Sequence, residues 1–473
     1  MHRSSRPLIS STDLLGLAAL VVLAATIGCA SPQPAEPTAT EEPANVVLVV
    51  IDTLRADRLG AYGYERSTSP FFDGLAETAV LFDQARAAAS CTSPSVNSIL
   101  TSRNPFLFRD SDAWPGIPDT MPTMASLLGE RGYSTAAVSA SPIVRRTPSN
   151  HNPVGGFGHG FDRFDESCMW RPASCVSARS LEAVDVLEEP FFLYAHYMDP
   201  HDPYRAEARF RGRFADTDDA HLPKAIREGQ PNALMPWLRD GSFDDNVAPE
   251  HIAHLEALYD EEILAADAGL RKLVGGLRKR GLLERTHLIV TSDHGEAFLE
   301  HGYLKHCYSV YDEEVRVPLL VRTADGASGR SSIAASLLDL LPTILDLAGA
   351  EAHPEAEGGS LRRWLAQPPE DAAAATPTDG RRLTFSGMGP YRAVTDGRWK
   401  LIDDLRAEPR LYDLEIDAGE TTDVLDTERR TFRELESLLT VWVEAGERGI
   451  DPQESLDRGR ELEEKLRSLG YLG

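Results

Sequence analysis

Short, continuous runs of apolar residues recur along the chain, and longer segments with helical spacing separate them. The first run, residues 45–51 (NVVLVVI), is rich in β-branched residues without polar alternation, which indicates a strand buried on both faces. Further strands are predicted at residues 135–138, 191–197, 287–291 and 317–322. Strands that alternate with helices predict an α/β fold, with a mostly parallel sheet and helices on both of its faces.

Two helices are predicted from apolar side chains that recur every three or four positions. The longer covers about residues 249–280, and the shorter covers residues 331–347. Ahead of the long helix, residues 205–248 are charged and interrupted by Gly and Pro, which is typical of an irregular insertion over one face of the sheet.

The hydrophobic pattern weakens after residue 350 and then returns as short strands. These strands are predicted at residues 392–395, 399–402 and 410–412, and a closing helix follows near residues 428–446. A chain of 473 residues is also too long for one simple core. We therefore predict a catalytic domain at residues 45–349 and a smaller C-terminal α+β part at residues 350–473 with an antiparallel sheet.

The N-terminus has the pattern of an export signal. A short basic segment precedes an apolar run at residues 14–27, which is shorter than the roughly 20 residues that span a bilayer. The segment 1–29 resembles a bacterial lipoprotein signal with cleavage before Cys29, to which a lipid is attached. Residues 30–44 are rich in Pro, Glu and Ala, as in a tether without a core.

We therefore expect an exported protein that a lipid on Cys29 anchors to a membrane, facing the periplasm or the cell surface. Thr26 occupies a position where such signals usually have an aliphatic residue. Plain secretion or an uncleaved anchor are the alternatives.

The charge of the chain limits its partners. With 74 acidic and 48 basic residues, the formal net charge is −26. This charge argues against nucleic acid and against an anionic membrane surface as partners. An anionic substrate would need a locally positive pocket.

Four cysteines follow Cys29 in the chain, and an exported location permits disulfides between them. Cys168 and Cys175 flank a turn-like segment (MWRPAS), so we expect a local bridge between these two. No CxxC pair has the spacing of a zinc ribbon, which argues against a structural zinc site.

Acidic and imidazole side chains follow two of the predicted strands directly. Asp52 comes after the first strand, and Asp293 and His294 come shortly after the strand at 287–291. Functional side chains of open α/β sheets gather at strand ends, and two carboxylates with an imidazole are ligands for a divalent metal. A single aspartate at a strand end is more often a turn or helix cap, so the prediction depends on the three together.

A hydroxyl group precedes a predicted helix in the segment 90–102 (SCTSPSVNSILTS). Pro94 suits the first helical position, which places Thr92 just ahead of the helix N-terminus, where backbone N–H groups and the dipole favour anions. A hydroxyl there can bind a metal, lose its proton and attack phosphorus or sulfur. The alternative is that Thr92 and Ser93 only cap the helix.

Eight segments of the chain resemble bacterial sulfatases and occur in the same order as in those enzymes. They are IDTLRADRLGAYGY at 51–64, TSPSVNSILTS at 92–102, HYMDPHDPY at 196–204, TSDHGE at 291–296, EHG at 300–302, VRVPLLVR at 315–322, RAVTDGRWKLI at 392–402 and LYDLEIDAGETTDV at 411–424. The resemblance covers nearly all of residues 45–473 and implies an alkaline-phosphatase-like α/β fold with a bound metal.

The resemblance also implies roles for single residues. The metal ligands would be Asp52, Thr92, Asp293 and His294, and the nucleophile would be Thr92. The remaining site residues would be His201 on the transferred group, His306 on the leaving side with Lys305 as a substitute cation, and Arg55 and His301 on the substrate side. For Arg55, an ion pair with Asp57 or Glu65 is the alternative.

The chain departs from sulfatases at the nucleophile. Those enzymes oxidise the Cys or Ser of a C/S-x-P-x-R pattern to formylglycine, whereas this chain has Thr92 two residues before Pro94 and Val96 in place of the arginine. Threonine cannot become formylglycine, so we expect none.

The chain also departs from sulfatases in its metal ligands, because Thr53 replaces the second aspartate that usually follows the first. The remaining ligand set favours zinc or manganese, and it is also compatible with calcium.

The leading function is hydrolysis of a sulfate ester of a small molecule or glycan. An unmodified threonine also resembles phosphoethanolamine transferases and nucleotide phosphodiesterases of the same superfamily. A phosphodiesterase, phosphonate hydrolase or phosphoryl transferase that uses Thr92 on a phosphate ester is therefore the alternative, and an inactive binding protein derived from a sulfatase is the second.

We further hypothesise that Cys91 and Cys307, which adjoin Thr92 and His306, pair with each other; two unrelated buried thiols are the alternative.

Overall fold

The computed structural model describes residues 43–108, 116–216, 221–240, 247–366 and 382–448. The predicted signal at residues 1–29 lies outside the described residues, and so does the predicted tether except for its last two residues. Within the described ranges, no helix is long and apolar enough to cross a membrane.

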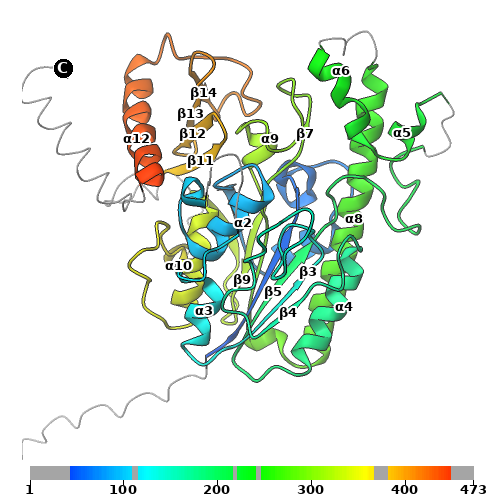
Figure 1. Ribbon diagram of the computed structural model, residues 1–473, viewed down its shortest axis with the longest axis vertical. Coiled ribbons are helices and arrows are strands. Elements are labelled where there is room, and N and C mark those ends of the chain that lie inside the picture. The colour runs from blue at the N-terminus through cyan, green and yellow to red at the C-terminus, as the bar shows by residue number, and fades with distance from the viewer. Residues whose placement is uncertain (1–42, 109–115, 217–220, 241–246, 367–381, 449–473) are drawn as a thin grey trace, which may run out of the picture. The chain divides into compact units, whose positions relative to one another are not determined.

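A central sheet of eight strands forms the middle layer of the fold (Figure 1). Its order is β10-β2-β9-β6-β1-β5-β3-β4, and every neighbouring pair is parallel except those that involve β9. The strands are β1 (Asn45–Ile51), β2 (Val80–Arg86), β3 (Ser134–Ser139), β4 (Arg163–Asp165), β5 (Phe191–Tyr197), β6 (Thr286–Ser292), β9 (Leu319–Arg322) and β10 (Gly329–Ser336). The mostly parallel sheet expected from the sequence is confirmed.

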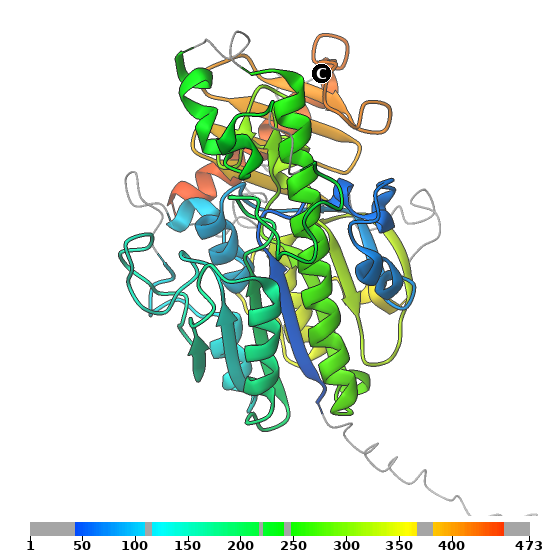
Figure 2. The same ribbon diagram turned by 90° about the vertical axis from the view of Figure 1, so that its right-hand side faces the viewer.

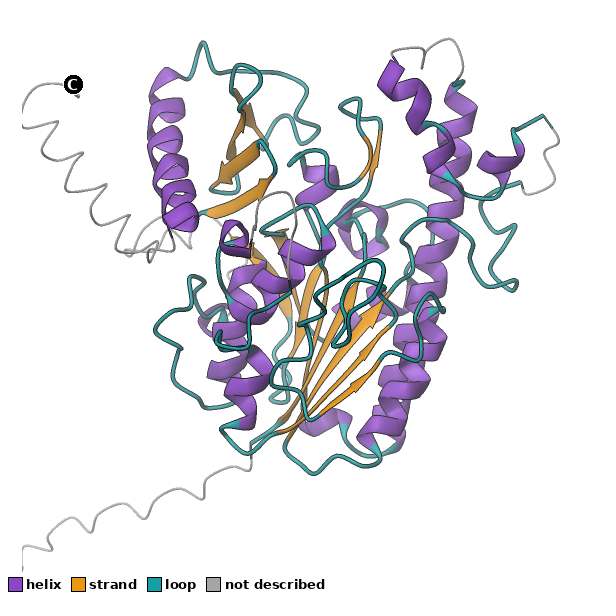
Figure 3. Ribbon diagram, viewed as in Figure 1, coloured by secondary structure: helices purple, strands orange, loops and turns teal. Residues whose placement is uncertain are grey.

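Helices cover both faces of this sheet, because side chains of each strand point alternately to one face and the other. Val47, Val49 and Ile51 of β1 pack with residues of one helical layer, and Val46 and Leu48 pack with those of the opposite layer. The first layer contains α1 (Pro70–Ala76), α4 (Ala173–Val184) and α8 (Pro249–Lys279), and the second contains α2 (Thr92–Thr101), α3 (Met124–Gly129) and α10 (Leu340–Leu347). Figures 2 and 3 show the helices flanking the sheet.

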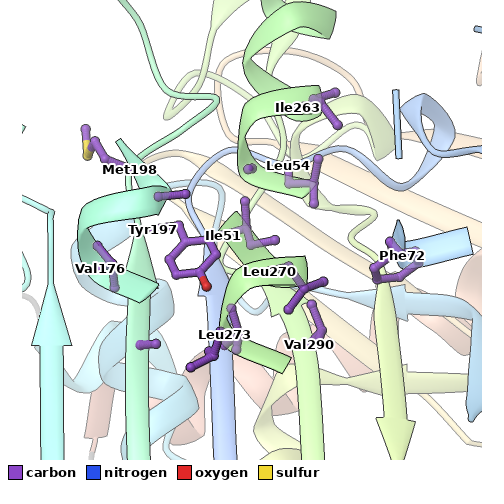
Figure 4. Packing of buried hydrophobic residues seen from close by; sticks show 14 of the residues in the cluster. Ile51, Leu54, Phe72, Val176, Tyr197, Met198, Ile263, Leu270, Leu273 and Val290 are labelled. Carbon is purple, nitrogen blue, oxygen red and sulfur yellow. The ribbon is translucent and has the colours of Figure 1, made fainter. Parts of the chain in front are cut away.

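The long helix α8 provides much of the packing in the first layer. Leu270 and Leu273 point from this helix toward Ile51 and Val290 on the strands, and Tyr197 of β5 lies beside them (Figure 4). All five side chains are buried. This packing fixes the carboxyl ends of β1, β5 and β6 relative to one another.

The C-terminal part has the antiparallel sheet and closing helix predicted from the sequence. The sheet contains β11 (Thr384–Met388), β12 (Tyr391–Thr395), β13 (Trp399–Asp404) and β14 (Arg410–Asp413), and the helix is α12 (Arg429–Arg448). Hydrogen bonds join this sheet to the chain just after β2: Ser386 Oγ donates to Ala87 O at 2.6 Å, and Gly387 N donates to Ala88 O at 2.8 Å.

A buried ion cluster also connects the two parts. Lys400 of β13 is fully buried and places Nζ 2.6 Å from Asp312 Oδ1 and 2.7 Å from Glu420 Oε1. Arg86, at the end of β2, forms a bidentate pair with the same Asp312. The C-terminal sheet is therefore held to the catalytic part by charges that have little access to water.

Replacing Lys400 by methionine is expected to lower the free energy of unfolding by about 3–5 kcal/mol, because Glu420 would stay buried without its cation. Denaturant titration measures the change. The matched control is Arg398→Met, which removes a half-exposed guanidinium that pairs with Asp413 of the same sheet and should cost far less. Equal effects of the two substitutions would contradict the role given to the buried cluster.

Two predictions about the elements were wrong or incomplete. The helix expected at residues 331–347 is instead the edge strand β10 followed by a short turn and α10, which begins only at Leu340. The small side chains of residues 329–336 (GRSSIAAS) have no clear period, whereas pairing with β2 fixes them as a strand. The strand β2 itself was not predicted, because polar residues interrupt its apolar run.

Candidate active site

The predicted chemical residues meet at the carboxyl edge of the central sheet. Strand β1 lies between β5 and β6 with parallel register, so Ile51 pairs with both Tyr197 and Ser292. Asp52 and Asp293 each follow one of these aligned strand ends. The register thus brings together two carboxylates that are far apart in the sequence, as the sequence predicted.

Asp52, Asp293 and His294 form a compact, fully buried group. One oxygen or nitrogen ligand atom from each lies within 4.8 Å of the others. His294 Nε2 is 3.8 Å from Asp52 Oδ1 and 3.5 Å from Asp293 Oδ2. Thr92 joins this group from another element, with Oγ1 3.1 Å from His294 Nε2. The four residues predicted as metal ligands are therefore neighbours in the structure.

Thr92 is the first residue of α2, two positions earlier than the helix start predicted at Pro94. Pro94 is tolerated within the first turn, because its missing N–H has no partner inside the helix. Thr92 is 2% exposed, so its hydroxyl faces the buried cluster rather than bulk water. The positive end of the α2 dipole therefore lies at the hydroxyl.

The hydrogen bonds of His294 fix its protonation pattern. Nδ1 lies 3.0 Å from the backbone oxygen of Gly295, which can only accept, so Nδ1 donates the hydrogen. In the tautomer that carries its hydrogen on Nδ1, the lone pair of Nε2 faces Thr92 and the two aspartates. A lone pair directed at carboxylates is unfavourable unless a cation lies between them.

The carboxylates show the same need for a cation. Asp52 Oδ1 and Asp293 Oδ2 are buried and have no hydrogen-bond partner among the described residues. Burial and the charge of Asp52 raise the pKa of Asp293 above its ordinary value. Burial also opposes ionisation of Asp52, but a hydrogen bond from His196 and the nearby imidazoles hold its pKa below the ordinary value. These orphaned oxygens and the lone pair of Nε2 fit a divalent metal ion.

The histidines assigned to the transferred and leaving groups lie beside this cluster. The ring centroid of His306 is 4.6 Å from that of His294 and 5.0 Å from that of His201. His201 Nδ1 donates to Asp202 O at 2.6 Å, and this hydrogen bond does not involve the other ring nitrogen, Nε2. Burial, together with His294 and His201, lowers the pKa of His306 well below its ordinary value, so its ring is neutral at neutral pH.

Lys305 has a different environment from His306. Its Nζ lies 2.9 Å from Asp202 Oδ1 and donates to Asn232 Oδ1 at 3.1 Å. Asn232 belongs to the insertion that was predicted over one face of the sheet. Lys305 therefore ties the insertion to the site, and His306 is the one of the two that contacts the His294 ring.

Arg55 and His301, which were predicted to bind the substrate, form ion pairs and hydrogen bonds with other residues of the protein. Arg55 is 5% exposed and pairs with Asp57 and Glu300, so the ion pair left open by the sequence is present. His301 uses Nδ1 on Glu313 at 2.7 Å and Nε2 on a backbone oxygen at 3.1 Å. We therefore propose structural roles for both residues in place of the predicted substrate binding.

Both expected disulfides are present. Cys168 pairs with Cys175, as the local spacing predicted. Cys91 pairs with Cys307 over a separation of 216 positions, which confirms the hypothesis that these two cysteines meet. The second bridge joins the residue before Thr92 to the residue after His306.

Sequence reasoning missed two buried partners of the site residues. His196 Nε2 donates to Asp52 Oδ2 at 3.3 Å, and His196 Nδ1 accepts from the hydroxyl of Tyr194 at 2.8 Å. Glu296 Oε1 lies 3.2 Å from His306 Nδ1. In the sequence, the signal for His196 was an imidazole near the end of an otherwise apolar strand. In the structure, His196 pairs directly with Val50 of β1.

Replacing His196 by glutamine is expected to weaken metal binding by about 10- to 100-fold, because Asp52 loses the donor that orients it. Competition with a chromogenic chelator measures the affinity. His287→Gln is the matched control, since His287 is also a buried strand histidine but accepts from Ala324 N, away from the cluster. Unchanged metal affinity in His196→Gln would contradict the orienting role.

An α/β sheet with a buried Asp, Asp, His and Thr group at its carboxyl edge defines an alkaline-phosphatase-like protein. Comparison with known proteins agrees with this class. The chain is 24% identical to N-acetylglucosamine-6-O-sulfatase of Bacteroides thetaiotaomicron over 81% of its length and 79% of that protein. It is 23% identical to choline-sulfatase of Rhizobium meliloti over 81% of its length and 83% of that protein.

Solved structures show the same fold. The phosphonate monoester hydrolase of Agrobacterium radiobacter matches with a TM-score of 0.66 and 20% identity, over 85% of this chain and 96% of that one. BT4656, solved with D-glucosamine-2-N,6-O-disulfate, matches with a TM-score of 0.69 and 19% identity, over 87% and 100%. The sulfatase family model matches residues 44–350. The chain belongs to the sulfatase family.

Proposed function

We propose that this protein is a metal-dependent hydrolase that cleaves a sulfate ester by attack of Thr92 Oγ1 on sulfur. One observation carries the proposal most directly. The Thr92 hydroxyl lies 3.1 Å from His294 Nε2, within a buried group whose two carboxylates are short of hydrogen-bond donors. A hydroxyl that only capped a helix would have no reason to share this group.

The residues that would hold the metal are Asp52, Asp293, His294 and Thr92. Three carboxylate or imidazole ligands with a hydroxyl favour zinc or manganese, and calcium is compatible with the oxygen ligands. When bound there, a divalent ion would supply a lower pKa for the Thr92 hydroxyl and would offset negative charge on the ester.

The protein's own residues then divide the remaining tasks. Thr92 releases its proton to water, its Oγ1–S bond forms, and the bond from sulfur to the leaving oxygen breaks with its electron pair on that oxygen. Burial keeps His306 neutral and raises the pKa of Glu296 well above its ordinary value, so their hydrogen bond holds a proton. Through His306 this proton can reach the leaving oxygen. Attack of water on sulfur then breaks the Oγ1–S bond and releases sulfate. One proton of the water returns to Thr92 Oγ1, and the other returns to the Glu296–His306 pair.

Phosphorus esters are the second candidate substrates, because the nucleophile is an unmodified threonine. A formylglycine hydrate can expel sulfate by elimination, whereas a threonine ester must be cleaved by a second attack at sulfur or phosphorus. Phosphonate monoester hydrolases are among the proteins with the same fold, with TM-scores of 0.66 and 0.67. This likeness supports phosphonate monoesters as the phosphorus substrates to assay first, with phosphodiesters beside them because of the unmodified threonine.

Turnover assays on the full chain test the proposal. Matched aryl sulfate, aryl phosphodiester and aryl phosphonate substrates are assayed after chelation, and again after zinc, manganese or calcium is returned. We expect aryl sulfate turnover that is lost on chelation and restored by zinc or manganese. Preference for a phosphorus ester would move the protein to the second candidate, and the absence of turnover with every metal would contradict both.

A further inference from the structure

A disulfide-closed loop presents one large aromatic side chain at the edge of the candidate active site. The loop extends from Cys168 to Cys175, and Trp170 within it is 47% exposed. Trp170 has φ +56°, a backbone region that bulky residues rarely adopt. An exposed tryptophan in this conformation requires the surrounding structure to hold it.

Hydrogen bonds on both sides of Trp170 hold the loop in place. Trp170 N donates to Ala140 O at 3.0 Å, directly after β3. Ala173 N donates to Asp199 Oδ2 at 2.6 Å, two residues before His201. The loop backbone is therefore tied to the same segment that supplies His201, which holds Trp170 beside the site.

The indole continues a row of rings that begins at the cluster. The centroids of His294 and His306 are 4.6 Å apart, those of His306 and His201 are 5.0 Å apart, and those of His201 and Trp170 are 6.2 Å apart in an edge contact. His151 contacts the same indole with centroids 5.9 Å apart. Trp170 thus lies at the outer end of this row, half-exposed and in contact with His201 at the edge of the candidate site.

We propose that Trp170 forms one wall of a subsite for the organic group of the ester, and that this group contains a six-membered ring with an apolar face. A half-exposed indole stacks on the C–H face of a sugar or on an aryl ring, and the anchored backbone of the loop lowers the conformational entropy lost in the contact. Sugar and aryl rings share this chemistry. The inference rests on the proposed function, since it places the leaving part of the same ester.

The test compares Trp170→Ala and Trp170→Phe on three esters of the same acid: a pyranose ester, an aryl ester and a small alkyl ester. We expect KM for at least one ring-bearing ester to rise about tenfold more than KM for the alkyl ester in Trp170→Ala. Trp170→Phe keeps an aromatic ring, so its KM for that ester should come back most of the way to the value of the unmodified protein. Leu405→Ala, which removes an exposed apolar side chain from the C-terminal part, is the control for surface change.

A binding measurement separates this inference from the proposed function. Calorimetric titration of the intact esters into Thr92→Ala, with and without Trp170→Ala, reports ring binding without turnover. Equal effects on alkyl and ring-bearing esters, or no effect of Trp170→Ala on binding and KM, would overturn the subsite. Turnover that persists in Thr92→Ala would instead overturn the proposed function, whatever Trp170 does.

Discussion

Replacing Thr92 by alanine is expected to lower kcat for the preferred ester by on the order of 10,000-fold. The substitution removes Oγ1, the atom that we propose forms the bond to sulfur or phosphorus. Serine at the same position keeps the hydroxyl and should retain much more activity than alanine. Steady-state kinetics on the three proteins, at saturating metal and substrate, give the comparison.

The matched control for this prediction is Thr101→Ala. Thr101 is in the same helix and is also buried, but its hydroxyl donates to the backbone oxygen of Asn97, one turn earlier. Its replacement should leave kcat near that of the unmodified protein. Activity of Thr92→Ala within tenfold of this control would show that Thr92 is not the nucleophile.

The second large effect is expected for the double substitution of Cys91 and Cys307 by serine. This disulfide joins the residue before the proposed nucleophile to the residue after His306, and Cys307 N also donates to Ser90 O at 2.8 Å. Without the bridge, Thr92 and His306 can shift relative to each other. A displacement of about 1 Å in a catalytic pair can cost about 100-fold in rate, so we expect a loss of that order in kcat.

The same substitution should also lower the free energy of unfolding by about 2–5 kcal/mol, because the bridge closes a long loop in the unfolded chain. Replacing Cys168 and Cys175 by serine is the control. That bridge joins cysteines only seven positions apart and should contribute less to stability and kcat. Denaturant titration and single-turnover kinetics measure both quantities. A larger loss of kcat in the control pair would contradict the role given to Cys91–Cys307.

Much of the fold could be predicted because the buried strands have unmistakable patterns. The runs at β1 and β5 are continuous and apolar, so their bounds agreed to the residue. The long helix α8 was also predicted to within one residue by the regular spacing of its apolar side chains. The edge strand β10 has no such pattern, since only pairing with β2 determines it.

The cluster itself was predictable because strand ends and short motifs point to it. Asp52, Asp293 and His294 follow strands, and Thr92 begins a helix. The surrounding contacts were not predictable, because they depend on how separate loops pack. Arg55 shows this limit, since only the fold brings Glu300 to it, 245 positions away.

The most direct measurement is mass spectrometry on protein that is quenched in acid during turnover of the preferred ester. We predict that the peptide containing Thr92 gains the mass of one sulfuryl or phosphoryl group, and that fragmentation places this group on Thr92. The adduct should be absent from Thr92→Ala and from protein without substrate. An adduct on another residue, or fast turnover without any adduct on this peptide, would contradict nucleophilic attack by Thr92.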